Sequence, residues 1–244
     1  MPTPGRPIAE IMRAAHSAGV VIPAFNIPHL PMMAGVVRAL RETGTFGLIA
    51  VARLEWMKFE SRSLEAVAEE YGRQMDPRFT RLHLDHVPVI DEDQQRVDYL
   101  AILKAAIRAG YDSLMVDGSR LSLTENIIAT REAVALGHEA GLPVEAELGA
   151  VLGHEAGPLP PYDELFASGA GFTKLDEARR FVTETGCDWL SVAIGNVQHN
   201  APIGVHGVAH VVDELEAAKR GAQAVAAVDA VQHHKLVLFS VELF

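Results

Sequence analysis

The sequence has almost no cysteine, no long apolar run and a shortage of basic residues relative to acidic ones. Its single thiol, Cys187, cannot form a disulfide within the chain, which favours a reducing compartment. No run of about 18 apolar residues is present, and the N-terminal residues lack the apolar segment of a signal peptide. We therefore expect a cytoplasmic protein with no membrane partner.

The shortage of basic residues is large, since 21 Lys and Arg face 32 Asp and Glu and the net charge is −11. Such an excess of acid argues against nucleic acid or an anionic membrane as the main partner. A small anionic substrate stays compatible with it, because a metal or a few local donors can reverse the sign of the potential inside a pocket. Linker-like Ser/Gly stretches and charge blocks are also missing, which predicts a single domain over residues 1–244.

Short apolar runs alternate with segments of helical spacing along most of the chain. The runs are apolar on both faces, as expected for parallel strands buried on both sides of a sheet. Arg96–Ala109 and Asp176–Thr185 have helical periodicity, and Ser122 with Glu125 has the spacing of a capping box. This alternation predicts an α/β fold with a parallel sheet. The six expected strands are Gly19–Phe25, Phe46–Ala52, Phe79–Asp85, Asp112–Val116, Leu142–Leu148 and Asp188–Ile194.

A TIM (β/α)₈-type barrel needs two more units than these six. The later chain offers Ile203–Val205 and Ala222–Val228 as weak strands and Leu236–Phe244 as a stronger one. The Gly- and Pro-rich segment Gly153–Gly171 is expected to be a long surface loop. We therefore predict a TIM-type barrel that is incomplete or irregular at its C-terminal end.

Nearly every expected strand ends in a polar side chain able to bind a ligand. In a parallel barrel these ends gather on one face, where active sites are built. Converging His, Asp and Glu side chains indicate a metal site with acid/base partners. The polar ends are Asn26, then His83 through His86, then Asp117-Gly118-Ser119, then Glu145 and Glu147, and then Gly195-Asn196 followed by His199.

Each of these ends also has a simpler interpretation. Asp117-Gly118-Ser119 by itself is more readily a turn before a helix. His83 is more readily a hydrogen-bonded core histidine. Glu145 and Glu147 share one face of their strand and could form a solvated edge. Their apolar neighbours instead favour a buried pair, which is costly unless it is paired or bound to metal.

Taken together, the motifs resemble those of the class II, zinc-dependent fructose-bisphosphate aldolase family, in the family's order, from about residue 8 to residue 197. The pair Asp85-His86 and the segment Glu145 to Gly149 are specific only in this combination. The motifs are Pro23-Ala24-Phe25-Asn26, Leu82-His83-Leu84-Asp85-His86, Met115-Val116-Asp117-Gly118-Ser119, Glu145-Ala146-Glu147-Leu148-Gly149, Gly153-His154-Glu155 and Thr185 through Gly195.

The resemblance implies roles for the matching residues. Asp85 is the implied acid/base at the cleaved carbon–carbon bond, and His86 is an implied ligand of the catalytic zinc. Asp117 and Glu147 are implied ligands of a second, neighbouring divalent metal position. Glu155, in a mobile loop, is implied to move the proton at the enolate carbon.

The resemblance also implies a substrate. The family cleaves a ketose bisphosphate, such as fructose or tagatose bisphosphate, to dihydroxyacetone phosphate and an aldehyde. A zinc ion suits this chemistry because a Lewis acid stabilises the charge of the enediolate. Asn26, Gly195 and Gly207 are the expected substrate-binding residues. Whether the protein forms a homo-oligomer stays open.

The last residues, 198–244, depart from the family pattern. Gln198 occupies the slot of the family's second zinc-binding histidine, and His199 follows one residue late. His206-Gly207 is the only echo of the later zinc and phosphate motif, and it is too close to His199 for an intervening helix and strand. Either a βα unit is missing or this tail is unrelated to the family, and the second alternative is favoured.

Two rival hypotheses accompany the aldolase. One is a truncated, catalytically impaired barrel homologue without a full zinc or phosphate site, and the amount of zinc bound per chain distinguishes it. The other, a Schiff-base aldolase, needs a lysine inside the barrel. It is disfavoured because the lysines all fall in expected helical or loop segments: Lys58, Lys104, Lys174, Lys219 and Lys235.

Overall fold

The computed structural model describes residues 5–149, 172–193 and 236–238. Strands and helices alternate along these ranges, as the apolar pattern predicts. The elements are α1 (Ile8–Ala18), β1 (Ala24–Asn26), α2 (Met32–Thr43), β2 (Gly47–Ala52), α3 (Arg53–Lys58), α4 (Leu64–Gln74), β3 (Thr80–Asp85), α5 (Tyr99–Ala109), β4 (Ser113–Asp117), α6 (Leu123–Glu139), β5 (Val144–Leu148), α8 (Leu175–Thr185), β6 (Trp189–Val192) and β7 (Leu236–Leu238).

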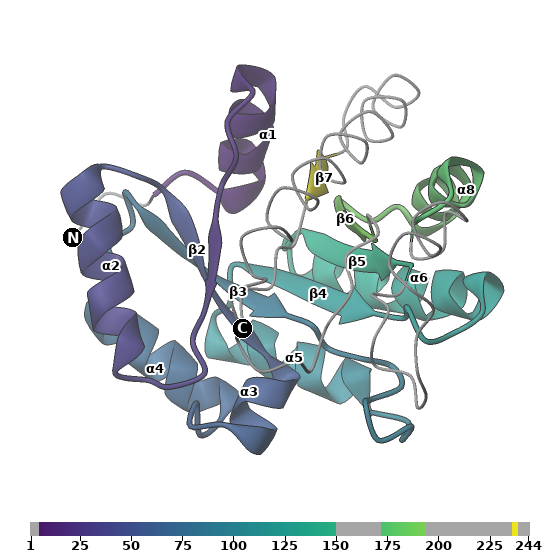
Figure 1. Ribbon diagram of the computed structural model, residues 1–244, viewed down its shortest axis with the longest axis horizontal. Helices are drawn as coiled ribbons and strands as arrows, with labels where there is room; N and C mark the ends of the chain where they lie inside the picture. Colours follow the sequence, from purple (N-terminus) through teal and green to yellow (C-terminus); the bar gives the residue numbers. More distant parts are fainter. Residues whose placement is uncertain (1–4, 150–171, 194–235, 239–244) are drawn as a thin grey trace, which may run out of the picture.

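The strands form one parallel sheet in the order β1-β2-β3-β4-β5-β6-β7. The sheet is curled (Figure 1), and within the described ranges β1 and β7 are its two edges. This is the architecture of a TIM-type barrel, as predicted from the sequence. The expected strand Leu236–Phe244 is present as Leu236–Leu238, paired with β6. The weaker candidates Ile203–Val205 and Ala222–Val228 lie outside the described residues.

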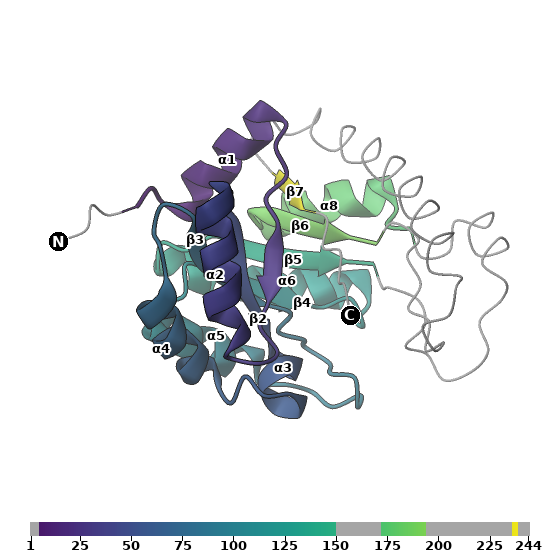
Figure 2. The ribbon, with the colours of Figure 1, turned by 60° about the vertical axis from the view of Figure 1, so that its left-hand side comes forward.

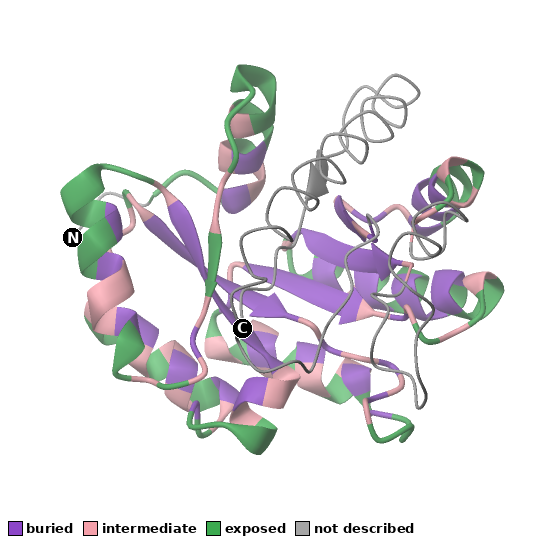
Figure 3. Cartoon of the chain, in the orientation of Figure 1, coloured by how far each residue is buried: buried purple, intermediate pink, exposed green. Residues whose placement is uncertain are grey.

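Helices α2, α4, α5 and α6 lie along the outer face of the curled sheet (Figures 1 and 2). Their apolar stripes face the strands, so the helices carry one buried and one exposed side while β2, β3 and β5 are buried throughout (Figure 3). In α2, for example, Met33, Val37 and Leu40 are the buried residues. Among the described ranges, every helix is too short or too polar to span a bilayer.

The two largest differences from the predicted boundaries lie at the starts of β1 and α5. The first strand starts at Ala24 instead of Gly19, because the backbone N–H groups of Gly19 and Val20 donate to the carbonyls of His16 and Ala15 and close the end of α1. Gly19 has a φ of 65°, which suits glycine at this position. Helix α5 starts at Tyr99 instead of Arg96, because the side chain of Asp98 caps it by accepting from the N–H of Ala101 at 3.1 Å.

Alternate residues of the strands point to the inner face of the curled sheet, and strand register sorts them into rows. Ala50 of β2, His83 of β3 and Ser113 of β4 are register partners in one row. Asp85 lies two residues further along β3, nearer the carboxyl ends. At the amino ends, α1 contributes Ile8 and Met12 to a separate apolar cluster with Leu48 and Trp189. We call this cluster the floor of the inner face.

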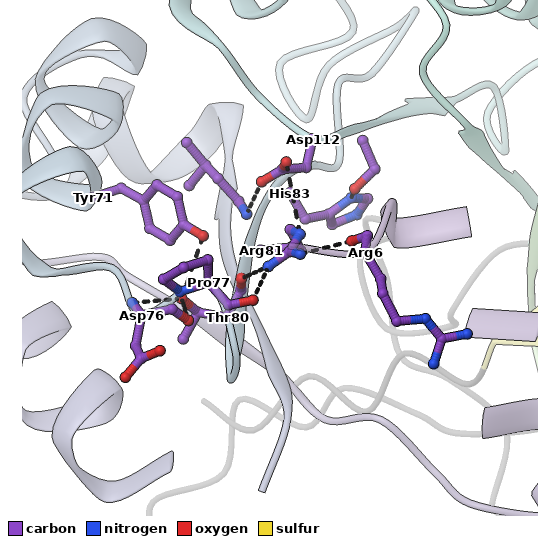
Figure 4. A network of polar contacts seen from close by, with 10 residues as sticks. Arg6, Tyr71, Asp76, Pro77, Thr80, Arg81, His83 and Asp112 are labelled. Carbon is purple, nitrogen blue, oxygen red and sulfur yellow. Dashed lines mark hydrogen bonds and ion pairs between the residues drawn. The ribbon is translucent and has the colours of Figure 1, made fainter. Parts of the chain in front are cut away.

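A buried arginine ties the N-terminal segment to the sheet near the floor (Figure 4). The guanidinium of Arg81 donates to the carbonyl oxygens of Pro77 at 2.7 Å, Thr80 at 2.6 Å and Arg6 at 2.6 Å. Asp112 lies 4.0 Å from it and also accepts from the N–H of Leu82. These contacts satisfy most of the charge and hydrogen-bonding capacity of a side chain that would be costly to bury alone.

Candidate metal and acid/base site

Three side chains from successive strand ends meet at the carboxyl edge of the sheet. His86 follows β3 directly, Asp117 ends β4, and Glu147 lies near the end of β5. His86 Nδ1 lies 3.2 Å from Glu147 Oε2 and 3.6 Å from Asp117 Oδ2. One potential ligand atom from each of the three residues lies within 4.8 Å of the others. This is the arrangement expected of side chains that share a cation.

The donor set fits a divalent metal. One imidazole nitrogen and two carboxylates suit zinc and similar divalent ions. Burial alone would raise the pKa of Asp117, but its contact with His86 and the hydrogen bond from Ser119 outweigh burial and hold that pKa below its ordinary value. Asp117 is therefore ionised at neutral pH, in the form that can bind a metal.

The backbone around the cluster is shaped to deliver these side chains. His86 has a φ of 27°, a left-handed conformation that is uncommon for residues other than glycine. Gly118 allows β4 to approach α6, because an added Cβ would overlap the side chain of Asn126. Asn126 itself donates to the carbonyl oxygen of Glu147 at 2.9 Å. Helix α6 thus braces two of the strand ends that carry the cluster.

The segment Asp117-Gly118-Ser119 fits both interpretations made from the sequence, which are a turn before a helix and a part of the metal site. Asp117 Oδ1 accepts from the N–H of Ser119 at 2.8 Å, which forms a turn before α6. Its other oxygen, Oδ2, faces His86. The same carboxylate therefore stabilises a turn and faces the cluster.

Asp85 lies beside the cluster with one carboxylate oxygen fixed. The side-chain amide of Asn26 donates to Asp85 Oδ2 at 2.8 Å. The other oxygen, Oδ1, lies 4.0 Å from His86 Nε2 and 3.9 Å from His83 Nε2. Asp85 is 7% exposed, so little bulk water competes for this second oxygen. A carboxylate held next to a cation site is suited to proton transfer on a bound molecule.

A row of polar side chains lies next to this site, one step nearer the amino ends of the strands. His83 Nδ1 lies 2.8 Å from Ser113 Oγ, and its Nε2 lies 3.4 Å from Glu145 Oε2. Burial lowers the pKa of His83 to about 4 and raises the pKa of Glu145 to about 8, in each case with smaller contributions from Asp85 and His86. Both groups are therefore mainly uncharged at neutral pH in the metal-free protein. The core-histidine interpretation of His83 is confirmed, and so is the burial of both glutamates.

The structure brings together Asn26, Asp85, His86, Asp117 and Glu147, all of which the sequence analysis singles out. It places His86 in one cluster with Asp117 and Glu147, where the resemblance assigns them to two neighbouring metal positions. The remaining predicted site residues lie outside the described residues: Glu155, Gly195, His199, His206 and Gly207.

Two supporting residues were missed from the sequence. Glu55 lies in α3 and Asn126 in α6, and both are buried at 4% and 2% exposure. A polar side chain in a short helix gives no periodic signal of its own. Asn126 had one indirect signal, because it follows the capping-box residue Glu125 on the helix after Asp117-Gly118-Ser119.

Comparisons with known proteins point to one family. The family model of class II fructose-bisphosphate aldolase matches residues 6–233, which extends past residue 197 into the tail that the sequence analysis sets apart. A fructose-bisphosphate aldolase of Thermus caldophilus is 30% identical over 186 residues, covering 76% of this chain and 55% of that protein. The chain thus spans about half the length of this curated relative.

Solved structures of aldolases are also similar to this chain. The YdjI aldolase from Escherichia coli K12 has a TM-score of 0.57 at 29% identity, covering 76% of this chain and 63% of its own. A putative fructose-1,6-bisphosphate aldolase from Coccidioides immitis has a TM-score of 0.59 at 28% identity, covering 83% and 64%.

Proposed function

Because the chain belongs to the class II fructose-bisphosphate aldolase family, we propose that it is a metal-dependent aldolase acting on a ketose bisphosphate such as fructose or tagatose bisphosphate. The products are dihydroxyacetone phosphate and an aldehyde. The observation that carries the proposal is the position of Asp85 next to the cluster of His86, Asp117 and Glu147, at the carboxyl edge of a parallel sheet.

We propose zinc as the metal, with His86 as a ligand and with Asp117 and Glu147 binding at the same or a neighbouring position. His199 and His206 are proposed as further ligands. When bound, the cation supplies Lewis-acid stabilisation for the negative charge that develops on substrate oxygens as the carbon–carbon bond breaks.

The protein's own residues account for the proton transfers. Asp85 accepts the proton of the substrate hydroxyl on the aldehyde side, so that this carbon becomes a carbonyl as its bond to the neighbouring carbon breaks. The electron pair of the broken bond stays with the dihydroxyacetone phosphate half. Glu155 is the proposed donor of the proton that this half then takes up at carbon. Asn26 and the glycines Gly195 and Gly207 are the proposed contacts to substrate.

Metal removal and restoration test the proposal directly. We expect chelation to abolish cleavage of fructose or tagatose bisphosphate and added zinc to restore it. The variant His86→Ala should lose zinc per chain and activity together, while Glu69→Gln, on the exposed outer face of α4, should change neither.

Each result has a clear meaning. A fully active, metal-free protein would rule out the mechanism. A folded protein that binds no zinc and cleaves neither sugar would instead support the rival hypothesis of an impaired barrel homologue.

A further inference from the structure

A single side-chain amide joins two buried carboxylates at the edge of the site. Asn26 Nδ2 donates to Asp85 Oδ2 at 2.8 Å and to Glu55 Oε2 at 3.4 Å. An amide nitrogen carries two N–H donors, so one Asn26 side chain can serve both acceptors. The two contacts also decide which end of the amide faces the carboxylates, because ionised carboxylates only accept hydrogen bonds.

The far end of this chain of contacts is anchored in the backbone. Glu55 Oε2 also accepts from the N–H of Ala52 at 2.7 Å. Ala52 ends β2 and is the register partner of Asp85 across the β2–β3 ladder. Glu55 is 4% exposed, so its carboxylate is held away from bulk water. The anchor is therefore attached to the strand next to the one that carries Asp85.

The arrangement determines which oxygen of Asp85 is available. With Oδ2 occupied by Asn26, the carboxylate presents Oδ1 toward His86 Nε2, at 4.0 Å. If the Asn26 amide turned over, its carbonyl oxygen would face Asp85 Oδ2 and the two oxygens would repel each other. The contact with Glu55 opposes that turn, because it requires the nitrogen end of the amide to face the two carboxylates.

We propose that Glu55 is a positioning residue that acts through Asn26 to orient the carboxylate of Asp85. This inference rests on the proposed aldolase function for its kinetic consequence, and it assigns a role to a residue outside the proposed metal ligands and proton-transfer groups. Supporting hydrogen-bond partners of this kind typically contribute about 10- to 100-fold to activity.

Kinetics on the full chain provide the first test. Glu55→Ala should lower kcat by about 10- to 100-fold with little change in KM and no change in zinc per chain, and Glu55→Gln, which retains an oxygen acceptor, should recover most of the loss. The matched control is Glu125→Ala. Glu125 likewise accepts from the backbone N–H three residues before it, that of Ser122 at 3.2 Å, but it lies on the exposed start of α6. We expect no kinetic change there.

A double-mutant cycle separates positioning from general loosening of the site. If Glu55 acts through Asn26, the combined variant Asn26→Ala with Glu55→Ala should be within about twofold of Asn26→Ala alone. Fully additive losses would overturn the proposal, as would a wild-type kcat for Glu55→Ala.

Crystal structures of the variants provide a readout that does not depend on activity. In Glu55→Ala we expect the Asn26–Asp85 hydrogen bond to lengthen or break and the Asp85 carboxylate to rotate, while Glu55→Gln keeps both. An unchanged Asn26–Asp85 bond in Glu55→Ala would overturn the inference. If the parent protein cleaves no ketose phosphate, the proposed function fails, and this structural comparison still decides the positioning role.

Discussion

The two ends of the inner face belong to the same sheet and have different roles. At the amino ends, Trp189 and Leu48 pack with Ile8 and Met12 to form an apolar floor. At the carboxyl edge, Glu147 and Asp85 lie in a cluster of ionisable side chains. The inner face of the sheet thus changes from apolar packing to ionisable groups between the amino and carboxyl ends of its strands, as expected of a barrel with an active site at the carboxyl ends.

Between these two ends lies the row of His83, Ser113 and Glu145. It is as buried as the floor, yet it is polar like the edge. His83 contacts both Ser113 and Glu145, and its hydrogen bond with Ser113 partly offsets the cost of burying these polar groups. The change from floor to site is therefore gradual, and variants at each level should separate stability from activity.

The largest effect is expected at the edge. Asp85→Asn keeps the size of the side chain and removes its ability to accept a proton, so turnover should fall by about 10²- to 10⁴-fold. Thermal unfolding and zinc content should change little, because Asp85 lies outside the apolar clusters. Steady-state kinetics and a thermal melt of the same sample check both expectations. Unchanged turnover would end the assignment of Asp85.

At the floor, the effect should fall on stability instead. Trp189→Ala removes a large side chain that is 3% exposed, which should lower the free energy of unfolding by about 3–5 kcal/mol. Denaturant unfolding measures the loss, and zinc per folded chain should be unchanged. Trp189→Phe should cost less. A Trp189→Ala protein of full stability would show that the floor does not support the fold.

The row of His83, Ser113 and Glu145 should make the stability of the protein depend on pH. The pKa of Glu145 is raised to about 8 by burial, so its stabilising contribution is present below about pH 4.5 and is lost as the pH rises toward 8. His83, whose pKa is lowered to about 4, opposes this, because its contribution to stability falls as the pH falls through its unfolded value of 6.5.

Above pH 6.5 the opposing contribution of His83 fades, and the Glu145 effect dominates the slope. The free energy of unfolding of the metal-free protein should fall by roughly 1–2 kcal/mol between pH 6.5 and pH 8. Glu145→Gln should flatten this slope, and denaturant titrations at several pH values provide the measurement. A slope that persists in Glu145→Gln would assign it to another group.

The smallest effect is expected outside the sheet. On α4, Arg73 lies 3.0 Å from Glu70 and 3.3 Å from Glu69, and these pairs are largely solvated. Arg73→Ala should therefore change the free energy of unfolding by less than about 0.5 kcal/mol and leave turnover unchanged. A larger loss would show that the outer helix face contributes more than its exposure suggests.

Much of this arrangement was predictable because it follows from local pattern. The strands are apolar on both faces, so their approximate places and their parallel pairing could be read from the sequence, and with them the gathering of His86, Asp117 and Glu147 at one edge. The start of the first strand could not be predicted. The backbone N–H groups of Gly19 and Val20 form hydrogen bonds that close the end of α1, and such bonds cannot be recognised from composition.

The supports of the site were harder to foresee. Glu55 reaches Asn26 across 29 residues, and Asn126 reaches the carbonyl of Glu147 across 21. Such contacts depend on how the helices pack on the sheet, and a sequence pattern of period two or 3.6 carries no information about them. The placement of His86 in one cluster with Asp117 and Glu147, where the resemblance implies two metal positions, likewise depends on distances between strands.

The left-handed backbone of His86 sets the stability of the fold against the proposed metal-binding role of this residue. A glycine at this position would adopt a φ of 27° without strain, whereas a non-glycine residue held there typically costs about 1–3 kcal/mol. Glycine has no imidazole, however, so relief of the strain would remove the proposed metal ligand. Selection for thermal robustness alone would favour replacing His86, and selection for a working site would retain it. Stabilised variants of this protein should therefore be sought elsewhere in the chain.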